Sequence, residues 1–411
     1  MKNFFKKLRL KRRVVTALAA LHFYGNPSTK LKVIGVTGTN GKTTTTTLLY
    51  KVATTLGYKA GLIGTVENII AGEVRDATHT TPDPIYLNKL LSEMAYRGCE
   101  YVFMEISSHA LDQRRVAGIT FAGGVFTNLT HDHLDYHKSL ENYFLAKKKF
   151  FKMLPTDAFA LANADDEHGR LMLEGTRARQ FFYGFKDAPD FKGEISSINF
   201  YGLELLFNQI YIKSHLLGKF NAYNLLAVWS VCQLLGFNME RVGKILETIE
   251  PPRGRFEHFT APNGVLVVVD YAHSPDALEK IFEAVLEIKQ RTGKLISVFG
   301  CGGDRDPLKR RVMGKIGAVN SDIAIFTSDN PRSENPEQII FEMKTDLSMK
   351  DTAKVKVISD RHEAIKEAVR IAKGGDIILC AGKGHETYQE IKGVKHHFSD
   401  MEEFKKAYGK L

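Results

Sequence analysis

The segment "GTNGKT", residues 38–43, has the residue types that bind a nucleoside triphosphate. Its glycines let backbone amides approach phosphate oxygens, the Lys42 ammonium can neutralise the terminal phosphates, and the Thr43 hydroxyl can bind Mg²⁺. Val36 stands where the usual phosphate loop has its first glycine, six residues before the lysine. We therefore expect ATP and Mg²⁺ at a variant loop, with these ATP-binding residues: Gly38, Thr39, Asn40, Gly41, Lys42 and Thr43.

Further segments carry side chains suited to metal or phosphate chemistry. Glu105 ends the apolar run of "FMEISSH", and a carboxylate at the carboxyl end of a buried strand is well placed as a second Mg²⁺ ligand. The segment "NLTHDHLDYH" follows another strand and is too rich in histidine and aspartate for a core, which indicates metal or phosphate binding. The three successive lysines of "LAKKKFF" are, by themselves, typical of an exposed helix face.

The elements that must position these residues alternate between strands and helices. "LKVIGV" predicts a buried strand before the phosphate loop, and "TTTTTLLYKVATTLG" predicts a helix after it. The alternation recurs, so we expect an α/β fold with a mostly parallel, doubly wound sheet covered on both faces. Between about residues 180 and 215 the apolar period changes to two, which predicts antiparallel strands at the sheet edge or beside it.

A second α/β series begins after the break "IEPPRGRFEHF". Five segments are candidates for buried strands: "GVLVVVDYAH", "KLISVFGCGG", "DIAIFTSDNP", "AKVKVISD" and "GDIILCAGKGHE". We therefore expect a basic leader and linker over residues 1–30, a central ATP-binding domain over 31–253, and a Rossmann-like, amino-acid-binding domain over 254–411.

Composition favours a globular cytoplasmic protein. Of 411 residues, 44% are hydrophobic and 25% are charged, and no apolar run is long enough to span a membrane. The four cysteines lack the spacing of a zinc site or a disulfide framework. Seven of the ten net positive charges lie in "MKNFFKKLRLKRR", so the leader is either an amphipathic helix that meets an anionic surface, a substrate phosphate or a membrane leaflet, or a solvated tail. Nucleic acid is not an expected partner.

Seven motifs in order resemble those of the Mur ligase family, the ATP-dependent enzymes that build the peptidoglycan stem peptide. They are "HTTPDP", "MEISSHAL", "DHLDYH", "DYAHSPDALE", "GCGGDRD", "SDNPRSE" and "AGKGHE", and the family's phosphate loop also reads GTNGKT. The resemblance extends from about residue 22 to the C-terminus. It implies a ligase that adds meso-diaminopimelate to a muramoyl-L-Ala-D-Glu acceptor through an acyl phosphate.

The resemblance also implies roles at the phosphate end of the site. Thr43 and Glu105 would hold one Mg²⁺, and His133 would help to hold a second. Lys147 matches a carbamylated lysine whose CO₂ adduct lies near the second metal, whereas Lys148 and Lys149 keep the exposed-face interpretation. Five further residues are similar to nucleotide-binding positions, the last three of them beyond the domain boundary: Asn221, Asn224, Arg255, Asp270 and His273. Asn221 and Asn224 would otherwise be interpreted as helix-cap residues.

Two sets of substrate residues follow from the same resemblance. The muramoyl peptide would be held by Thr80, Thr81, Ser107, Gln113 and Arg115. Diaminopimelate would be held by Arg305, Asp329, Asn330, Arg332, Gly382 and Glu386. Arg332 is the signature of diaminopimelate use, because a guanidinium can pair bidentately with the distal carboxylate that lysine lacks. Glu386 is expected to meet the distal ammonium.

Two departures from the family pattern stand out. His131 occupies a position where the family commonly has arginine. The chain also begins close to the central domain, where family members carry a preceding domain that binds UDP. We expect one of three explanations: the basic leader binds the diphosphate, the acceptor is lipid-linked or lacks UDP, or a partner protein supplies the domain. A nucleotide-binding scaffold without ligase activity is the alternative of a different class.

Overall fold

The computed structural model describes residues 2–186, 188–289 and 292–409. It divides into two compact units, which are described separately below. Unit 1 comprises Met1–Ser197 and Leu203–Ile249, and unit 2 comprises Ile198–Gly202 and Glu250–Leu411.

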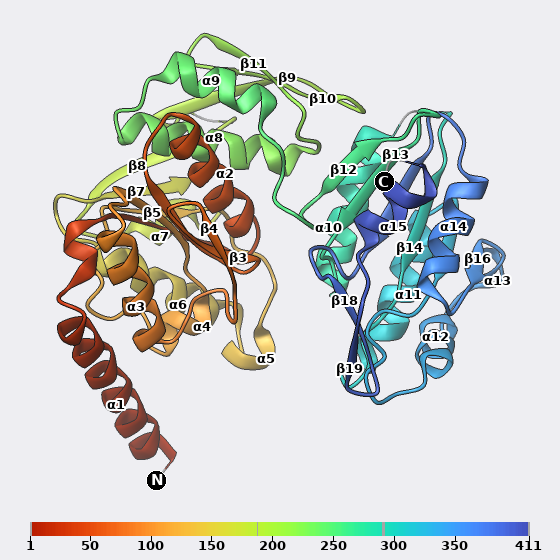
Figure 1. The fold of residues 1–411 in the computed structure, drawn as a ribbon, viewed down its shortest axis with the longest axis horizontal. Helices are drawn as coiled ribbons and strands as arrows, with labels where there is room; N and C mark the ends of the chain where they lie inside the picture. Colours follow the sequence, from red (N-terminus) through yellow and green to blue (C-terminus); the bar gives the residue numbers. More distant parts are fainter. Residues whose placement is uncertain (1, 187, 290–291, 410–411) are drawn as a thin grey trace. The chain divides into compact units, whose positions relative to one another are not determined.

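Within the described residues, unit 1 is built on a sheet of eleven strands (Figure 1). In spatial order they are β11 (Ile210–Ser214), β10 (Gly202–Phe207), β9 (Phe191–Asn199), β8 (Arg179–Gly184), β7 (Phe159–Asn163), β6 (Gly123–Phe126), β1 (Lys32–Thr37), β5 (Tyr101–Glu105), β2 (Ala60–Ile63), β3 (Glu67–Ile70) and β4 (Glu73–Asp76).

The central strands are parallel, as the sequence predicted. β1 pairs in parallel with β5 and β6, and the parallel pairing continues through β7, β8 and β9. All five residues of β5 are buried, because a parallel strand is covered on both faces and must be apolar throughout. The predicted antiparallel edge is confirmed for β10 and β11, whereas β9 pairs in parallel with β8.

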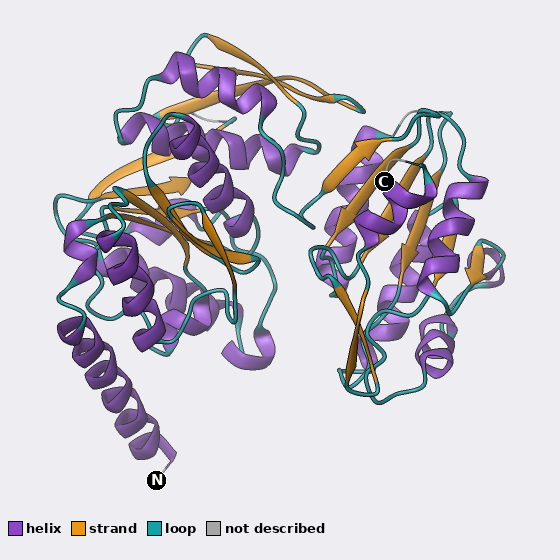
Figure 2. Cartoon of the chain, viewed as in Figure 1, coloured by secondary structure: helices purple, strands orange, loops and turns teal. Residues whose placement is uncertain are grey.

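Helices of unit 1 form two packed groups around this sheet (Figure 2). One group contains α2 (Lys42–Thr55), α8 (Lys219–Leu234) and α9 (Met239–Thr248). The other contains α4 (Ser108–Asp112), α5 (Leu134–His137), α6 (Leu140–Met153) and α7 (Gly169–Leu173). The start of α3 (Pro84–Tyr96) is fixed by Asp83, whose side chain accepts hydrogen bonds from the amides of Ile85 and Tyr86.

The leader forms α1 (Lys2–Phe23), which lies against α3 and is followed by the 3₁₀ turn Pro27–Lys30. Ala17 and Ala20 of α1 are buried, and Arg12 is exposed. The other predicted cations of the leader, at positions 2 to 11, lie outside the residues whose side chains are described. Among the described helices, none is long and apolar enough to cross a bilayer.

In the described part of unit 2, a six-stranded sheet carries the second α/β series (Figure 1). Its spatial order is β12 (Glu257–Thr260), β13 (Leu266–Asp270), β17 (Ile377–Ala381), β14 (Leu295–Phe299), β15 (Ile323–Phe326) and β16 (Val355–Val357). Around it lie α10 (Pro275–Ile288), α11 (Leu308–Asn320), α12 (Pro336–Lys344), α13 (Met349–Thr352), α14 (Arg361–Ile371) and α15 (Asp400–Ala407), with the hairpin β18 (Tyr388–Ile391) and β19 (Val394–His397).

All five predicted strands of this unit are present, but the prediction that each is buried is wrong for one of them. β16 is partly or fully exposed at its three residues, because it is the last strand at an edge of the sheet. An edge strand has a neighbour on one side alone, and here the alternation of valine and lysine reflects that position.

Candidate active site

The predicted phosphate loop connects β1 to α2. Gly38 and Gly41 have φ angles of 151° and 83°, which favour glycine, and a Cβ on Gly38 would lie 1.9 Å from Thr127 Oγ1. The Lys42 ammonium donates hydrogen bonds to the carbonyl oxygens of Gly38 (2.9 Å) and Thr39 (2.8 Å). Because α2 begins at Lys42, the amides of its first turn face the loop and make it suited to bind an anion.

Two side chains that the sequence analysis did not single out hold this loop. Thr127 Oγ1 donates to the Asn40 carbonyl oxygen (2.6 Å), and Asn128 Oδ1 accepts a hydrogen bond from the Asn40 amide (2.9 Å). The Thr39 amide donates to the Asn128 carbonyl oxygen (2.8 Å). The available signal was their position directly after β6, the strand that neighbours β1.

Glu105 connects the loop to the end of β5. Its Oε2 accepts a hydrogen bond from Thr43 Oγ1 (3.0 Å), and its Oε1 accepts one from the Thr65 amide (2.7 Å). The side chain is 1% exposed. A threonine hydroxyl and a carboxylate are hard oxygen donors, so this pair fits Mg²⁺. Thr65 was missed, because nothing in its local sequence marks it.

Lys147 lies on α6 with its amine inside the protein. The side chain is 1% exposed, and its Nζ donates a hydrogen bond to the Gly38 carbonyl oxygen (2.6 Å). Burial, reinforced by the positive charge of Lys42, lowers the pKa of Lys147 well below the ordinary lysine value. A lowered pKa increases the fraction of neutral amine, which is the form that can react with CO₂.

The other two lysines of the run differ from their predicted exposed face. Lys148 is 14% exposed at its side chain and pairs with Glu174 (3.3 Å), and Lys149 pairs with Asp112 (3.1 Å). These ion pairs arise because α6 packs against α7 and α4, which the sequence run does not reveal.

Histidine and tyrosine rings form a cluster next to Lys147. His133 has a φ of 53°, and its ring lies 4.8 Å from the His109 ring and 6.1 Å from the Tyr143 ring. The Tyr143 ring lies 4.3 Å from Lys147 Nζ. Burial lowers the pKa of His137 to about 4, and its Nε2 lies 2.9 Å from the hydroxyl of Ser108. In the described part of the chain, no three His, Cys, Asp or Glu side chains form a metal-binding group.

The predicted acceptor residues gather at the end of β5. Thr81 Oγ1 donates to the Glu105 carbonyl oxygen (2.8 Å) and accepts a hydrogen bond from the Ser107 amide (3.0 Å). Thr65 Oγ1 lies 3.0 Å from Thr80 Oγ1 and 3.0 Å from Glu105 Oε2. Glu105 therefore connects the phosphate loop to these residues, through its carboxylate to Thr43 and through its backbone carbonyl oxygen to Thr81.

Gln113 and Arg115 extend the acceptor network after α4. The Arg115 guanidinium donates to Gln113 Oε1 (3.0 Å) and to the Thr81 carbonyl oxygen (2.7 Å). All five predicted acceptor residues are thus connected by short contacts within unit 1.

Asn221 and Asn224 lie in α8 beside the phosphate loop. A Cβ on Gly41 would lie 2.5 Å from Asn224 Oδ1, and Asn224 Nδ2 donates to Asn221 Oδ1 (3.0 Å). Both side chains are buried. The cap position of α8 belongs to Gly218, so the helix-cap interpretation of the two asparagines is wrong.

The predicted nucleotide residues of unit 2 form a cluster of their own. The Arg255 guanidinium lies 5.0 Å from the centroid of the Tyr271 ring, and that ring lies 4.5 Å from the His273 ring. The Asp270 carboxylate accepts a hydrogen bond from the Phe256 amide (2.7 Å). Burial raises the pKa of Asp270, and the charge of Arg255 opposes that rise.

His385 belongs to this cluster and was missed, although it lies inside the quoted "AGKGHE". Its ring is 4.8 Å from the Tyr271 ring. Burial, with the nearby charge of Arg255, lowers its pKa to about 4. Gly254 touches the same loop, because a Cβ there would lie 2.0 Å from the His385 amide nitrogen.

The predicted amino-acid residues follow the carboxyl ends of β14, β15 and β17, three neighbouring parallel strands. Asp329 is buried, and its Oδ2 has no hydrogen-bond partner among the described residues. Gly382 has a φ of 115°, and a Cβ there would lie 2.6 Å from that oxygen. A buried carboxylate oxygen beside a glycine is suited to a cationic ligand group.

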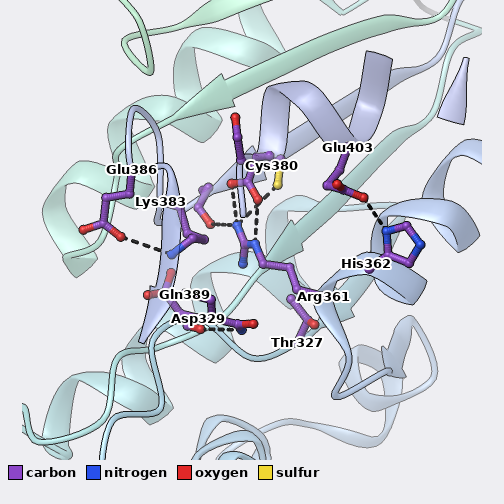
Figure 3. Close-up of polar contacts among 12 residues, drawn as sticks. Thr327, Asp329, Arg361, His362, Cys380, Lys383, Glu386, Gln389 and Glu403 are labelled. Atoms are coloured by element: carbon purple, nitrogen blue, oxygen red, sulfur yellow. Dashed lines mark hydrogen bonds and ion pairs between the residues drawn. The ribbon is translucent and has the colours of Figure 1, made fainter. Parts of the chain in front are cut away.

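Glu386 and Asn330 are held by a lysine that the sequence analysis missed (Figure 3). Lys383 is fully buried, and its ammonium contacts Asn330 Oδ1 (3.0 Å) and Glu386 Oε2 (3.1 Å). Asn330 Nδ2 also donates to Glu386 Oε2 (2.8 Å). A ligand ammonium would therefore have to use the other oxygen of Glu386.

Arg332 and Arg305 both approach Gly302. A Cβ on Gly302 would lie 3.0 Å from Arg332 Nη1 and 3.8 Å from Arg305 Cγ. Arg332 has a φ of 50°, donates to the Gly303 carbonyl oxygen (2.7 Å) and lies 3.4 Å from Glu390 Oε2. The Arg332 guanidinium and the Arg305 side chain thus both lie next to Gly302.

Comparison with known proteins agrees with this arrangement. Residues 36–232 match the Mur ligase middle domain, and residues 254–384 match the family described as "Mur ligase, glutamate ligase domain". The chain is 54% identical over 383 residues to a UDP-N-acetylmuramoyl-L-alanyl-D-glutamate--2,6-diaminopimelate ligase of Cytophaga hutchinsonii. That alignment covers 93% of this chain and 79% of the relative.

The chain belongs to the Mur ligase family. It is accordingly an ATP-dependent ligase that forms an amide bond. A relative of the same name from Bacteroides fragilis is 51% identical over 390 residues, covering 95% of this chain and 80% of the relative.

Solved structures extend the Mur ligase comparison to the fold. A solved UDP-N-acetylmuramoyl-L-alanyl-D-glutamate--2,6-diaminopimelate ligase has a TM-score of 0.67 at 35% identity, over 92% of this chain and 78% of that one. A folylpolyglutamate synthase of Mycobacterium tuberculosis has a TM-score of 0.69 at 17% identity, over 90% and 92% of the two chains, and shares the fold.

Proposed function

We propose that this Mur ligase is of the MurE type and joins meso-diaminopimelate to the D-Glu carboxylate of a muramoyl-L-Ala-D-Glu acceptor. The names of relatives 51–54% identical support this substrate pair. The observation that carries the proposal is the position of Glu105, which contacts Thr43 of the phosphate loop and, through its carbonyl oxygen, Thr81 of the acceptor set. A terminal phosphate bound at the phosphate loop would therefore lie next to an acceptor carboxylate bound at the predicted acceptor residues.

In the first step, a carboxylate oxygen of the acceptor would attack the γ-phosphorus of ATP, and ADP would leave. Lys42 and the amides at the start of α2 would stabilise the charge on the transferring phosphoryl group. Thr81, Ser107 and Arg115 would orient the acceptor. These roles use hydrogen-bond donors that unit 1 holds in fixed positions.

Mg²⁺ would be held by Thr43 and Glu105, and a second ion by His133 and carbamylated Lys147. A bound Mg²⁺ supplies charge neutralisation at phosphate oxygens. The Lys147 carbamate would form when the neutral amine attacks CO₂ and loses a proton, which changes a cation into an anion.

In the second step, the amine of the incoming amino acid would attack the acyl carbon, and phosphate would leave with the bonding electron pair. Asp329 and Glu386 carry carboxylates suited to the ammonium groups of diaminopimelate. Arg332, with Arg305 nearby, is suited to its distal carboxylate.

Phosphate release tests this proposal directly. ATP consumption should require both a muramoyl dipeptide and meso-diaminopimelate, and lysine should replace diaminopimelate poorly. The Arg332→Ala variant should lose about 100-fold or more in kcat/KM for diaminopimelate, because a bidentate charged pair is removed. Equal use of lysine, or an unchanged Arg332→Ala enzyme, would overturn the specificity.

The acceptor is tested by comparing UDP-linked, UDP-free and lipid-linked muramoyl dipeptides in the same assay. We propose the UDP-linked form, on the names of the relatives. Equal rates with and without UDP would overturn recognition of the nucleotide. Stimulation by no acceptor at all would contradict ligase activity and leave a nucleotide-binding protein.

A further inference from the structure

Unit 1 contains a cavity of about 240 Å³ beside the predicted acceptor residues. Gln113 and Arg115, two of the predicted acceptor residues, line this cavity. It is also lined by residues that are not among the predicted substrate residues: Arg13 and Thr16 of α1, and His79, Asp83 and Pro84 at or before the start of α3.

The direction of Arg13 is set by the packing of α1. Arg13, Ala17 and Ala20 follow one another at helical spacing, so they share one face of the helix. Ala17 is 0% exposed and Ala20 is 6% exposed, which shows that this face is turned toward the body of unit 1.

Gly118 lies against a neighbouring face of the helix. A Cβ on Gly118 would lie 2.8 Å from Leu21 Cδ2 and 3.0 Å from Leu18 Cδ2. Together with the packing of α1 against α3, this close approach shows that α1 lies against the body of unit 1.

The charges around the cavity are unbalanced. Arg13 and Arg115 each bring a guanidinium, whereas Asp83 is the one carboxylate among the lining residues. Asp83 already caps α3, because its Oδ1 accepts hydrogen bonds from two amides at the start of that helix. The Arg115 hydrogen bonds go to neutral oxygens, those of Gln113 and Thr81.

The charge of Arg13 also affects the pKa of Arg115. Burial lowers the pKa of Arg115, and the charge of Arg13 lowers it further. Two like charges facing one small cavity repel each other, and an anion between them would relieve that repulsion.

We propose that Arg13 is an acceptor-binding residue that, with Arg115, binds one oxyanion of the muramoyl peptide substrate. The proposal rests on the proposed function, since it adds α1 to the acceptor site. A cavity of this size is below that of a whole ligand site, so it takes one phosphate or carboxylate group. Guanidinium groups suit both kinds of oxyanion because they pair with them through two parallel hydrogen bonds.

The test compares Arg13→Gln with Arg12→Gln in the full chain. Both variants remove one charge from the same turn of α1, but Arg12 is exposed and does not line the cavity. Arg13→Gln should raise KM for the acceptor about 10- to 100-fold, the loss expected for a charged hydrogen-bonded pair, with kcat changed less than about twofold. Arg12→Gln should leave both constants unchanged.

Two acceptors identify the oxyanion. If KM rises for the UDP-linked acceptor alone, the group is a phosphate of the diphosphate. If it rises equally for the UDP-free muramoyl dipeptide, the group is a peptide carboxylate. Equal KM values for the two variants with both acceptors would overturn the proposal. A wild-type enzyme that no acceptor stimulates would instead overturn the proposed function, and equal melting temperatures for the variants exclude a folding defect.

Discussion

Lys147 combines burial with a position directly behind the phosphate loop. Its amine donates to the Gly38 carbonyl oxygen, and its pKa is lowered by burial and by Lys42. An ordinary lysine is almost fully protonated at pH 7 and does not attack CO₂. A lowered pKa increases the fraction of neutral, nucleophilic amine at a given pH, so it favours carbamate formation relative to an exposed lysine.

Activity should therefore depend on dissolved CO₂. In CO₂-depleted buffer at pH 7.5 to 8 we expect the rate of phosphate release to fall at least about tenfold, and bicarbonate to restore it, because removal of one charged group from a phosphoryl-transfer site has effects of this order. A carbamate resonance in ¹³C spectra after addition of labelled bicarbonate should be lost in Lys147→Met.

Lys149→Gln is the matched control for this experiment. Lys149 lies on the same helix but pairs with Asp112 at the surface, so its replacement should leave both the resonance and the CO₂ dependence unchanged. A rate that is indifferent to CO₂, or a resonance that survives in Lys147→Met, would contradict the assignment.

At the scale of secondary structure, one buried ion pair connects the loops of unit 2 (Figure 3). Arg361 begins α14 and makes two 2.7 Å hydrogen bonds to Asp400 at the start of α15. It also donates to the Ala381 carbonyl oxygen at the end of β17 (3.1 Å). Burial alone would lower the pKa of Arg361, but the Asp400 carboxylate raises it above the ordinary value, so the guanidinium stays charged.

Breaking this pair should destabilise unit 2. Asp400→Ala should lower the free energy of unfolding by about 3–5 kcal/mol, because an unpaired buried cation remains. Replacing both partners together, as Arg361→Met with Asp400→Leu, should cost much less. Lys356→Gln, which breaks the exposed pair of Lys356 with Glu367, should cost under about 1 kcal/mol. Urea denaturation of the four proteins measures these differences, and equal losses for Asp400→Ala and Lys356→Gln would refute the argument.

The sequence predicted those elements whose signal is local. Continuous apolar runs marked the strands that are covered on both faces, and glycine spacing marked the phosphate loop. Partners that meet across the fold left no such signal: Thr65 contacts Glu105, and Thr127 contacts the phosphate loop, each from the loop that follows another strand. Burial of β16 was mispredicted for the same reason, since position in a sheet is set by strand order and not by the residues of the strand.

The predicted sites of the molecule divide between the two units. Unit 1 contains the phosphate loop, the Thr43–Glu105 pair and the predicted acceptor residues, whereas unit 2 contains the predicted amino-acid residues and a second set of predicted nucleotide residues. Each unit has its own sheet and core. Under the proposed function, loss of a site residue in unit 1 should stop formation of the acyl phosphate. Loss of a predicted diaminopimelate-binding residue in unit 2 should stop only the reaction of the acyl phosphate with the amino acid.

Trapping the acyl phosphate separates these two steps. With ATP and acceptor but no amino acid, borohydride reduction should convert the activated carboxylate to an alcohol in wild type and in Arg332→Ala to similar extents. Lys42→Ala should yield at least about 100-fold less alcohol than wild type, because the transferring phosphoryl group loses the cation that stabilises its negative charge. When diaminopimelate is present before borohydride is added, it should consume the acyl phosphate, so the alcohol should no longer form in wild type but should still form in Arg332→Ala. If Arg332→Ala instead lost the trapped alcohol as completely as Lys42→Ala, the amino-acid residues would be needed for phosphorylation itself, and the division of chemistry between the units would be wrong.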